Sequence, residues 1–351
     1  VSNHEKYLRR CLELAENGCS KVEPNPYVGC VIVHDDCIIG EGWHRKFGEA
    51  HAEVNAIASV KDQQLLKDST LYVNLEPCSH FGKTPPCADL IVQHGIPRVH
   101  ISMQDPNPRV AGKGIAKLRN AGIEVTVGEL EDEAKFLNRR FLTFHAQNRP
   151  YVILKWAQTA DSFIDIDRSN PDLKTANNWI SGPELKVLVH KWRAQEMGIL
   201  VGRKTVENDN TELTVREWNG KNPIRIILSN REMDENKYKV FNNEAETWVI
   251  QPFREGESDN AQYIRLPELK NSVENILDLL YQRFIFSLIV EGGRETLDMF
   301  IQSGLWDEAR VITGEKEFNK GLRAPELPEV KLIRTEKYGT DTLRIYMNES
   351  L

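Results

Sequence analysis

One imidazole, two thiols and one carboxylate lie close together in the first quarter of the chain. The stretch H-A-E-V-N-A-I begins at His51 and places Glu53 two residues after the imidazole. The stretch E-P-C-S-H-F-G-K-T-P-P-C supplies the thiols Cys78 and Cys87. A catalytic zinc ion takes three protein ligands and keeps one position open for water. We therefore predict that His51, Cys78 and Cys87 bind zinc, and that Glu53 transfers protons in a hydrolytic deamination.

Two alternatives use the same residues without catalysis. A structural zinc site would take a fourth protein ligand and would have no use for Glu53. Two unrelated core cysteines are also possible, because free Cys is among the most buried residue types. The separation of Cys78 and Cys87, with eight residues between them, departs from the P-C-x-x-C spacing of many deaminases. The combination of both motifs, each after an apolar run, favours the catalytic interpretation.

Local structure must bring these groups together. A helix beginning near His51 would direct His51 and Glu53 from its first turn toward one point. A helix beginning near Cys87 would place this thiol at a helix N-terminus, where the backbone dipoles favour a thiolate. Apolar periodicity in this half predicts strands at 28–33, 37–40, 71–75, 98–103 and 123–127, and helices through 7–15, 87–94, 112–120 and 132–145. Helices alternating with strands indicate an α/β sandwich, with the site where strands give way to helices.

The polar sequence Asn148-Arg149-Pro150 interrupts this series, and we predict a domain boundary there, between domains 1–147 and 151–351. A second α/β series follows. Its predicted strands are 151–156, 199–201, 224–228, 247–250, 287–290, 309–313 and 342–346, and its predicted helices are 183–195, 273–284 and 294–302.

Composition limits the class of protein. The 351 residues suffice for two hydrophobic cores, and the net charge of −7 without a long basic run argues against a nucleic-acid partner. No apolar run is long enough to span a membrane, and the first residues lack the features of a signal peptide. All six cysteines lie in the first quarter, unlike a disulfide scaffold. We therefore expect a cytoplasmic protein that acts on a small molecule.

Two stretches of the second half are suited to a nucleotide. The sequence I-V-E-G-G-R-E-T-L at 289–297 is a strand, a glycine pair and a helix, which lets backbone approach a pyrophosphate. Ser229-Asn230-Arg231 offers groups that suit a 2′-phosphate, which would select NADPH over NADH. The first stretch lacks the full G-x-G-x-x-G pattern and is also compatible with a simple turn that starts a helix. The second stretch is also compatible with an ordinary surface turn.

The chain resembles the bifunctional riboflavin-biosynthesis deaminase/reductase family over nearly its whole length. The resemblance is carried by H-A-E-V-N-A, L-E-P-C-S-H-F-G-K-T-P-P-C, P-N-P-Y-V-G-C-V-I-V at 24–33 and D-P-N-P-R-V-A-G-K-G at 105–114. It implies a cytidine-deaminase-like α/β/α sandwich followed by a dihydrofolate-reductase-like α/β domain. It further implies zinc-dependent deamination of 2,5-diamino-6-ribosylamino-4(3H)-pyrimidinone 5′-phosphate, NADPH-dependent reduction of the ribosyl to a ribityl side chain, and a homodimer.

The resemblance also assigns binding residues. The implied deaminase substrate contacts are Asn25, His44, His80, Lys83, Asp105 and Asn107. The implied reductase substrate contacts are Lys155, Asn177, Arg193, Leu213, Arg216 and Glu291. The implied cofactor contacts are Gln158, Thr159, Asp161, Trp179, Thr205, Asp209, Ser229, Gly292, Gly293, Arg294, Glu295 and Thr296. Without the resemblance, His44 and Lys83 could each be an ordinary solvated surface residue. Trp179 and Leu213 could each be an ordinary residue of the hydrophobic core.

The sequence departs from the family pattern in two loops of the second half. Ala160-Asp161-Ser162 stands where the family has L-D-G, and Asp209-Asn210-Thr211 stands where it has D-D-P. These changes affect the expected geometry of the reductase loops but not the class of enzyme.

Two other functions would use parts of the same sequence pattern. A different nucleobase or polynucleotide deaminase with an unrelated second domain would favour the shorter cysteine spacing and, for RNA, a basic surface. A non-catalytic zinc module joined to a nucleotide-sensing domain would not require Glu53.

Overall fold

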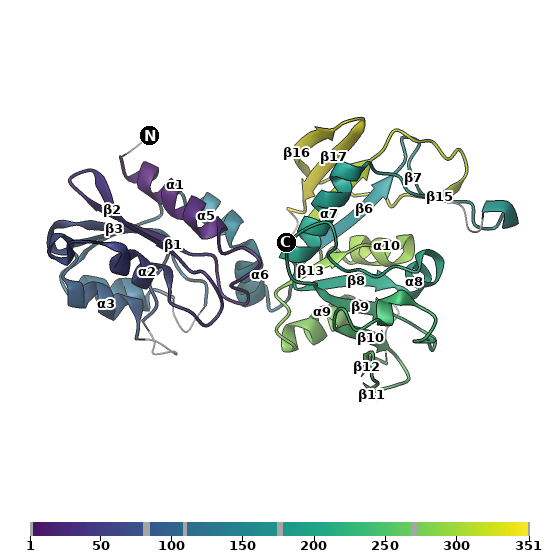
Figure 1. Ribbon diagram of the computed structural model, residues 1–351, viewed down its shortest axis with the longest axis horizontal. Helices are drawn as coiled ribbons and strands as arrows, with labels where there is room; N and C mark the ends of the chain where they lie inside the picture. The colour runs from purple at the N-terminus through teal and green to yellow at the C-terminus, as the bar shows by residue number, and fades with distance from the viewer. Residues whose placement is uncertain (1–2, 80–84, 108–110, 174–177, 268–272, 350–351) are drawn as a thin grey trace. The chain divides into compact units, whose positions relative to one another are not determined.

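The chain divides between Asn148 and Arg149 into two units, each with its own sheet (Figure 1). The computed structural model describes residues 3–79, 85–107, 111–173, 178–267 and 273–349. Of the predicted site residues, His80, Lys83 and Asn177 lie outside the described residues.

The first unit is a five-stranded sheet with helices on both faces (Figure 1). The strand order is β2-β1-β3-β4-β5, with β1 antiparallel to β2 and β3, and with β3, β4 and β5 parallel. The strands are β1 Gly29–His34, β2 Cys37–Trp43, β3 Thr70–Leu75, β4 Arg98–Met103 and β5 Glu124–Val127. The helices are α1 Asn3–Glu16, α2 Ala52–Ser59, α3 Cys87–His94, α4 Lys113–Asn120, α5 Glu131–Leu137 and α6 Arg139–Gln147, with a 3₁₀ helix at Gln63–Asp68.

Strand β1 shows why this sheet needs helices on both faces. Its successive side chains point to opposite faces, as in any strand. Cys30 and Ile32 pack in the core that contains α2 and α3, whereas Val31 and Val33 pack against α1. The continuous apolar run predicted at 28–33 is therefore a strand buried on both sides, and this half is an α/β/α sandwich.

The single helix predicted at 132–145 is wrong, because α5 and α6 are separate helices that meet at Asn138. The Asn138 side chain accepts the Tyr27 N–H at 2.7 Å and donates to the Tyr27 carbonyl at 3.0 Å, both as buried contacts. Apolar periodicity continues across this residue. The break comes from tertiary hydrogen bonding, which periodicity does not record.

The second unit is built on a ten-stranded sheet with the order β11-β12-β10-β9-β8-β13-β6-β14-β17-β16. The central strands of this order, β12, β10, β9, β8, β13, β6 and β14, are parallel to one another. Strand β11 pairs antiparallel with β12 at one edge, and β17 and β16 are antiparallel additions at the other edge. These strands are β6 Tyr151–Gln158, β8 Gly198–Gly202, β9 Ile224–Leu228, β10 Thr247–Gln251, β11 Gly256–Glu257, β12 Gln262–Arg265, β13 Ser287–Val290, β14 Glu308–Thr313, β16 Lys331–Tyr338 and β17 Asp341–Met347. A separate pair is formed by β7 Phe163–Ile166 and β15 Gly321–Arg323.

Helices cover both faces of this sheet (Figure 1). Helices α7 Pro183–Gln195 and α8 Arg203–Asp209 share one core with the sheet, and α9 Val273–Gln282 and α10 Arg294–Ser303 share the other. Two 3₁₀ helices lie at Pro171–Leu173 and Lys239–Phe241. The carboxyl ends of β6, β8 and β13 lie side by side, which is where ligands bind in parallel α/β sheets. Among the described residues, no helix has the length and apolar character needed to cross a membrane.

Candidate active sites

The three predicted zinc ligands form a cluster in the first unit. Their ligand atoms all lie within 4.8 Å of one another. The Nδ1 atom of His51 is 3.6 Å from the Cys78 sulfur and 3.4 Å from the Cys87 sulfur. A tetrahedral zinc ion with ordinary Zn–N and Zn–S bonds separates such atoms by roughly 3.5 Å. The donor set and its spacing therefore fit zinc.

Two helix starts build this cluster. His51 is the N-cap residue of α2, and Cys87 is the first residue of α3, after Pro86. The Cys87 backbone N–H points at the Cys78 sulfur at 3.3 Å. Hydrogen bonds from the Cys87 thiol, from His51 and from this N–H lower the pKa of Cys78 well below its usual range. Cys78 is thus favoured as a thiolate, the form that binds metal.

Glu53 is buried in the first turn of α2, where it lies beside Cys87 without being one of the three clustered ligands. Burial, and then the negative charge of Cys78, raise the pKa of Glu53 to about 7. A carboxyl group with a pKa near neutrality can both accept and return a proton. This is the property that the predicted role of Glu53 requires.

The structure brings Asn25 and His44 beside the cluster. The His44 ring lies 5.5 Å from the His51 ring, edge to face. His44 Nδ1 is 3.1 Å from the Ala50 carbonyl, an acceptor, so Nδ1 carries the proton. His44 Nε2 is then free to accept from the Asn25 amide at 3.0 Å. Burial lowers the pKa of His44, which keeps this neutral form dominant.

Glu76 is a residue of this site to which the sequence assigned no role. It is buried, it follows β3, and it precedes Cys78 by two residues. Its carboxylate accepts four backbone N–H groups, those of Asp105, Gly112, Gly114 and Ile115, at 2.9 to 3.2 Å. Glu76 therefore ties the loop that carries the predicted contacts Asp105 and Asn107 to the loop that carries Cys78. An acidic residue directly after a largely apolar strand was the available signal.

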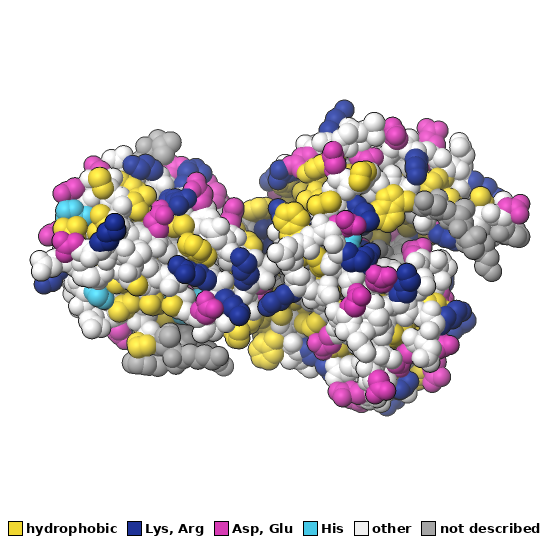
Figure 2. All heavy atoms as spheres, viewed as in Figure 1, with side chains coloured by type: hydrophobic (Ala, Val, Ile, Leu, Met, Phe, Trp, Pro, Cys, Tyr) yellow, Lys and Arg dark blue, Asp and Glu magenta, His cyan; other side chains and the backbone are white. Residues whose placement is uncertain are grey.

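The second unit contains a cavity of about 2010 Å³ at the carboxyl ends of β6, β8 and β13. Figure 2 shows this unit hollowed beside α8, with Lys, Arg, Asp and Glu side chains around the hollow. Typical small-molecule sites occupy roughly 300–1,000 Å³. The cavity is therefore large enough for a dinucleotide and a second ligand together.

Three charged side chains with little exposure to solvent meet on one wall of this cavity. Arg193 donates to both oxygens of Glu291, from Nε at 2.9 Å and from Nη2 at 2.7 Å. The Lys155 ammonium lies 3.7 Å from the same carboxylate. Burial acts to raise the pKa of Glu291, but the charges of Arg193 and Lys155 prevail and lower it to about 2. Burial lowers the pKa of Lys155, against the opposing effect of Glu291.

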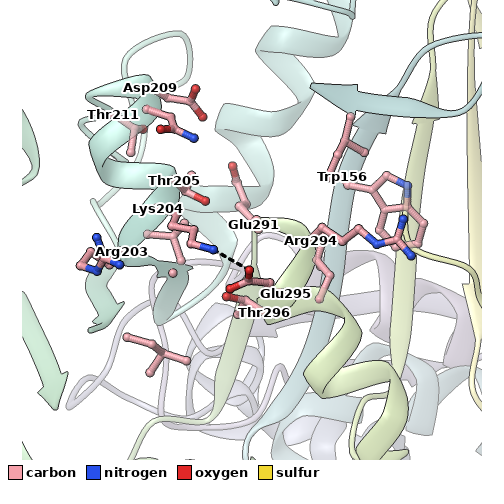
Figure 3. A pocket seen from close by; sticks show the side chains of 18 of the residues that line it. Trp156, Arg203, Lys204, Thr205, Asp209, Thr211, Glu291, Arg294, Glu295 and Thr296 are labelled. Atoms are coloured by element: carbon pink, nitrogen blue, oxygen red, sulfur yellow. Dashed lines mark hydrogen bonds and ion pairs between the residues drawn. The ribbon is translucent and has the colours of Figure 1, made fainter. Parts of the chain in front are cut away.

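Most of the predicted reductase residues line this cavity. Those that do are Lys155, Trp179, Arg193, Thr205, Asp209, Leu213, Arg216, Glu291, Gly292, Gly293, Arg294, Glu295 and Thr296. Figure 3 shows Thr205, Glu291, Glu295 and Thr296 close together, with the ion pair between Lys204 and Glu295.

Four predicted cofactor residues are instead engaged in local hydrogen bonds, at the end of β6 and in the loops that follow β6 and β9. Gln158 accepts from the indole of Trp156 at 2.8 Å. The Thr159 hydroxyl donates to Asp161 at 2.5 Å, and Asp161 accepts the backbone N–H groups of 318 and 319. The Ser229 hydroxyl donates to the Arg231 carbonyl at 2.5 Å. Asn230 and Arg231 line the cavity, so this loop presents its amide and guanidinium.

The glycine pair shapes the wall next to α10. Gly292 has φ of +119°, a conformation that residues with a side chain rarely adopt. A Cβ atom on Gly293 would lie 3.1 Å from the Thr205 hydroxyl oxygen. Gly293 is also the N-cap of α10, so the first backbone N–H groups of this helix lack partners within the helix. Because Gly292 and Gly293 have no side chains, a ligand can approach these N–H groups closely. This cradle fits a pyrophosphate.

Of the cavity-lining cations that were missed from the sequence, two lie at the start of α8. Arg203 and Lys204 begin α8 and line the cavity. The buried Nε atom of Arg203 has no hydrogen-bond partner among the residues described here. The available signal was G-R-K-T directly after the predicted strand 199–201.

The altered loop 160–162 has a strained residue. Ser162 has φ of +66°, the left-handed conformation in which glycine is favoured. Leu213 is also left-handed, with φ of +55°, and it is buried at the cavity. Such conformations persist only where the surroundings impose them.

Both halves match known families. The cytidine and deoxycytidylate deaminase zinc-binding region matches residues 1–103, and the RibD C-terminal domain matches residues 150–343. The chain is 40% identical over 328 residues to riboflavin biosynthesis protein RibD of Aquifex aeolicus, which covers 92% of this chain and 90% of that protein. It is 35% identical over 336 residues to RibD of Escherichia coli, covering 91% and 89%.

Solved structures agree over the whole chain. One of them is the diaminohydroxyphosphoribosylaminopyrimidine deaminase/5-amino-6-(5-phosphoribosylamino)uracil reductase of Thermotoga maritima. It superposes with a TM-score of 0.89 at 38% identity, and the match covers 99% of each chain. Acinetobacter baumannii RibD superposes with a TM-score of 0.88 at 32% identity, covering 98% of each.

Proposed function

Since the chain belongs to the RibD family of bifunctional riboflavin-biosynthesis enzymes, we propose that its two sites act on one pyrimidine phosphate in turn. The enzyme is a zinc-dependent deaminase and an NADPH-dependent reductase. The proposed substrates are 2,5-diamino-6-ribosylamino-4(3H)-pyrimidinone 5′-phosphate for the first unit, and the deaminated product for the second. The proposed domains are 1–147 and 151–351.

In the deaminase, Glu53 is the proposed proton carrier. A zinc ion held by His51, Cys78 and Cys87 supplies Lewis-acid activation of water. The Glu53 carboxylate accepts one proton of the attacking water and passes it to the ring nitrogen. It then accepts the proton of the hydroxyl group formed on the attacked carbon and passes it to the leaving amine, so that ammonia departs as the carbonyl forms. Its burial and its pKa near 7 support this role.

The neighbours of the cluster are the proposed substrate contacts of the deaminase. Asn25 and His44 are hydrogen-bonded to each other and placed to orient the pyrimidine. Asp105 and Asn107 belong to the loop that Glu76 anchors. His80 and Lys83 stay predicted contacts that lie outside the described residues.

In the reductase, Lys155 is the proposed proton donor. NADPH supplies a hydride to the ribosyl carbon. Opening of the ribosyl ring leaves an oxygen that needs a proton, and the buried Lys155 ammonium on the cavity wall can give it. Glu291 orients Lys155 and Arg193, while Leu213, Arg216 and the predicted contact Asn177 complete the substrate end.

The cofactor is proposed to lie along α8 and the start of α10. The glycine cradle at Gly292 and Gly293 receives the pyrophosphate, and Arg203 and Arg231 are the proposed partners of the 2′-phosphate. The other proposed contacts are Trp179, Thr205, Asp209, Arg294, Glu295 and Thr296. Direct contacts of the cofactor with Gln158, Thr159, Asp161 and Ser229 stay predictions.

One observation carries this proposal: both sites occur in one chain. The first unit has a complete zinc-binding set beside the buried acid Glu53. The second unit has a dinucleotide-sized cavity with Lys155, Glu291 and Arg193 on one wall. The test is an assay of the diamino substrate with and without NADPH. We expect ammonia release in both conditions, and NADPH oxidation only after deamination. Ammonia release that requires NADPH, or no oxidation of NADPH after deamination, would contradict the proposal.

The enzyme is further proposed to be a cytoplasmic homodimer. The family resemblance supports the dimer, and the free state of all six cysteines fits a reducing compartment. Analytical ultracentrifugation of the purified chain should give twice the monomer mass, and a monomer at micromolar concentration would reject the dimer.

A further inference from the structure

His190 lies in the reductase cavity and is unused by the mechanism above. It belongs to α7, its side chain is only 3% exposed, and it lines the cavity together with Arg193 and Arg216. A buried imidazole that lines an active-site cavity can offer one of its ring nitrogens to a ligand.

One hydrogen bond fixes the tautomer of this ring. The backbone N–H of Arg216 donates to His190 Nδ1 at 3.0 Å. Since Nδ1 accepts, the proton of the neutral ring is on Nε2. Burial, and then the charges of Arg193 and Arg216, lower the pKa of His190 to about 4, so the ring is neutral at physiological pH. Within the described part of the chain, no residue accepts a hydrogen bond from Nε2.

The cations around His190 already have carboxylate partners. Lys155 and Arg193 share Glu291. Arg216 pairs with Glu212 at 2.9 Å, and Lys186 pairs with Glu217 at 2.7 Å. An anion entering this end of the cavity must compete with those carboxylates for each cation. The Nε2 N–H of His190 has no such competitor.

We propose that His190 binds the phosphate of the reductase substrate, donating a hydrogen bond from Nε2 to a phosphate oxygen beside Arg193 and Arg216. This inference rests on the proposed function, which supplies a phosphorylated ribosyl compound to this cavity. His190 thereby helps to select the phosphorylated substrate over its dephosphorylated riboside. It takes no part in hydride transfer.

The test is a reductase assay at saturating NADPH with 5-amino-6-(5-phosphoribosylamino)uracil and with the corresponding riboside. For His190→Ala we expect the KM of the phosphorylated compound to rise about ten- to a hundredfold, the usual effect of losing a hydrogen bond to a charged group. The KM of the riboside and the KM of NADPH should stay within about twofold. His190→Gln should retain most of the affinity, because its amide can accept from Arg216 and donate to phosphate.

Controls separate binding from folding. Lys191→Ala changes the next residue of α7, which contacts the Trp218 ring and does not line the cavity, and it should leave both KM values unchanged. Deaminase turnover of each variant reports on the rest of the chain. If His190→Ala does not fold, His190→Met fills a similar volume without an N–H and should show the same selective rise.

The assignment of His190 would be overturned by equal losses on the phosphorylated and dephosphorylated compounds, or by a His190→Gln variant as impaired as His190→Ala. A wild-type enzyme that oxidises NADPH with neither compound would instead remove the reductase assignment, and this inference with it. Wild-type activity with unchanged KM in every His190 variant would remove the inference alone.

Discussion

Replacing Glu291 by glutamine should shift the pH dependence of the reductase through Lys155. Glu291→Gln keeps the shape of the side chain and can still accept from Arg193, but it removes the negative charge 3.7 Å from the Lys155 ammonium. In the wild-type enzyme, that charge raises the pKa of Lys155 against the lowering effect of burial. Without it, the pKa of Lys155 must fall further.

The size of the shift follows from the geometry. Two unit charges 3.7 Å apart interact by about 4 kcal/mol at an effective dielectric constant near 20, which corresponds to about 3 pKa units. Because Arg193 shares the carboxylate, this value is an upper limit, and we expect a decrease of at least about one unit. If the protonated amine is the acid of the reaction, activity is lost as pH rises through its pKa. The alkaline limb of the kcat profile should therefore move to lower pH in Glu291→Gln.

The assay is NADPH oxidation at saturating substrate over a range of pH. The control is ammonia release by the same preparation, since the deaminase residues lie in the first unit. An alkaline limb at the wild-type pH in a folded variant, whose kcat is otherwise measurable, would refute Lys155 as the titrating acid.

Three further changes test separate parts of the structure. Glu53→Gln should keep about one zinc ion per chain by metal analysis, yet lose deaminase turnover by about 10²–10⁴-fold or more, and near-normal turnover would assign the proton transfer elsewhere. Asn138→Ala leaves the Tyr27 N–H without its partner, so the free energy of unfolding measured by urea titration should fall by about 1–3 kcal/mol. An unchanged free energy of unfolding would show that the hydrogen bonds between Asn138 and Tyr27 do not stabilise the fold. Ser162→Gly removes the backbone strain of a serine in the left-handed conformation, so the free energy of unfolding should increase by up to about 1 kcal/mol and the thermal midpoint should rise. A lower midpoint would show that the serine side chain stabilises the turn.

The zinc site was predictable because its chemistry is local in sequence. His51 and Glu53 share one helix turn, and Cys78 and Cys87 share one short motif, so the sequence identifies the groups that the starts of α2 and α3 bring together. The apolar runs of β4, β9 and β13 and of α3 and α7 were equally clear, and their observed bounds match the predicted ones. The fold class, the enzyme class and both cofactors are also confirmed by the family matches.

The remaining features depend on contacts between distant segments. Lys155 meets Glu291 because β6 pairs in parallel with β13, with Leu154 opposite Val290. Glu76 acquires its role from backbone N–H groups about thirty to forty residues further along the chain. Helix α8 was not predicted, because Val206 is its only buried residue, and β16 was not predicted because it is a largely exposed edge strand. Apolar periodicity does not record these interactions.

The independence of the two chemistries is tested most directly by supplying the deaminated phosphoribosyl intermediate and NADPH to folded Glu53→Gln enzyme. The zinc cluster and Glu53 lie in the first unit, and the cavity residues lie in the second. We predict that the variant releases almost no ammonia from the diamino substrate but oxidises NADPH at the wild-type rate with the supplied intermediate. Loss of both activities in the folded variant would contradict two separate active sites.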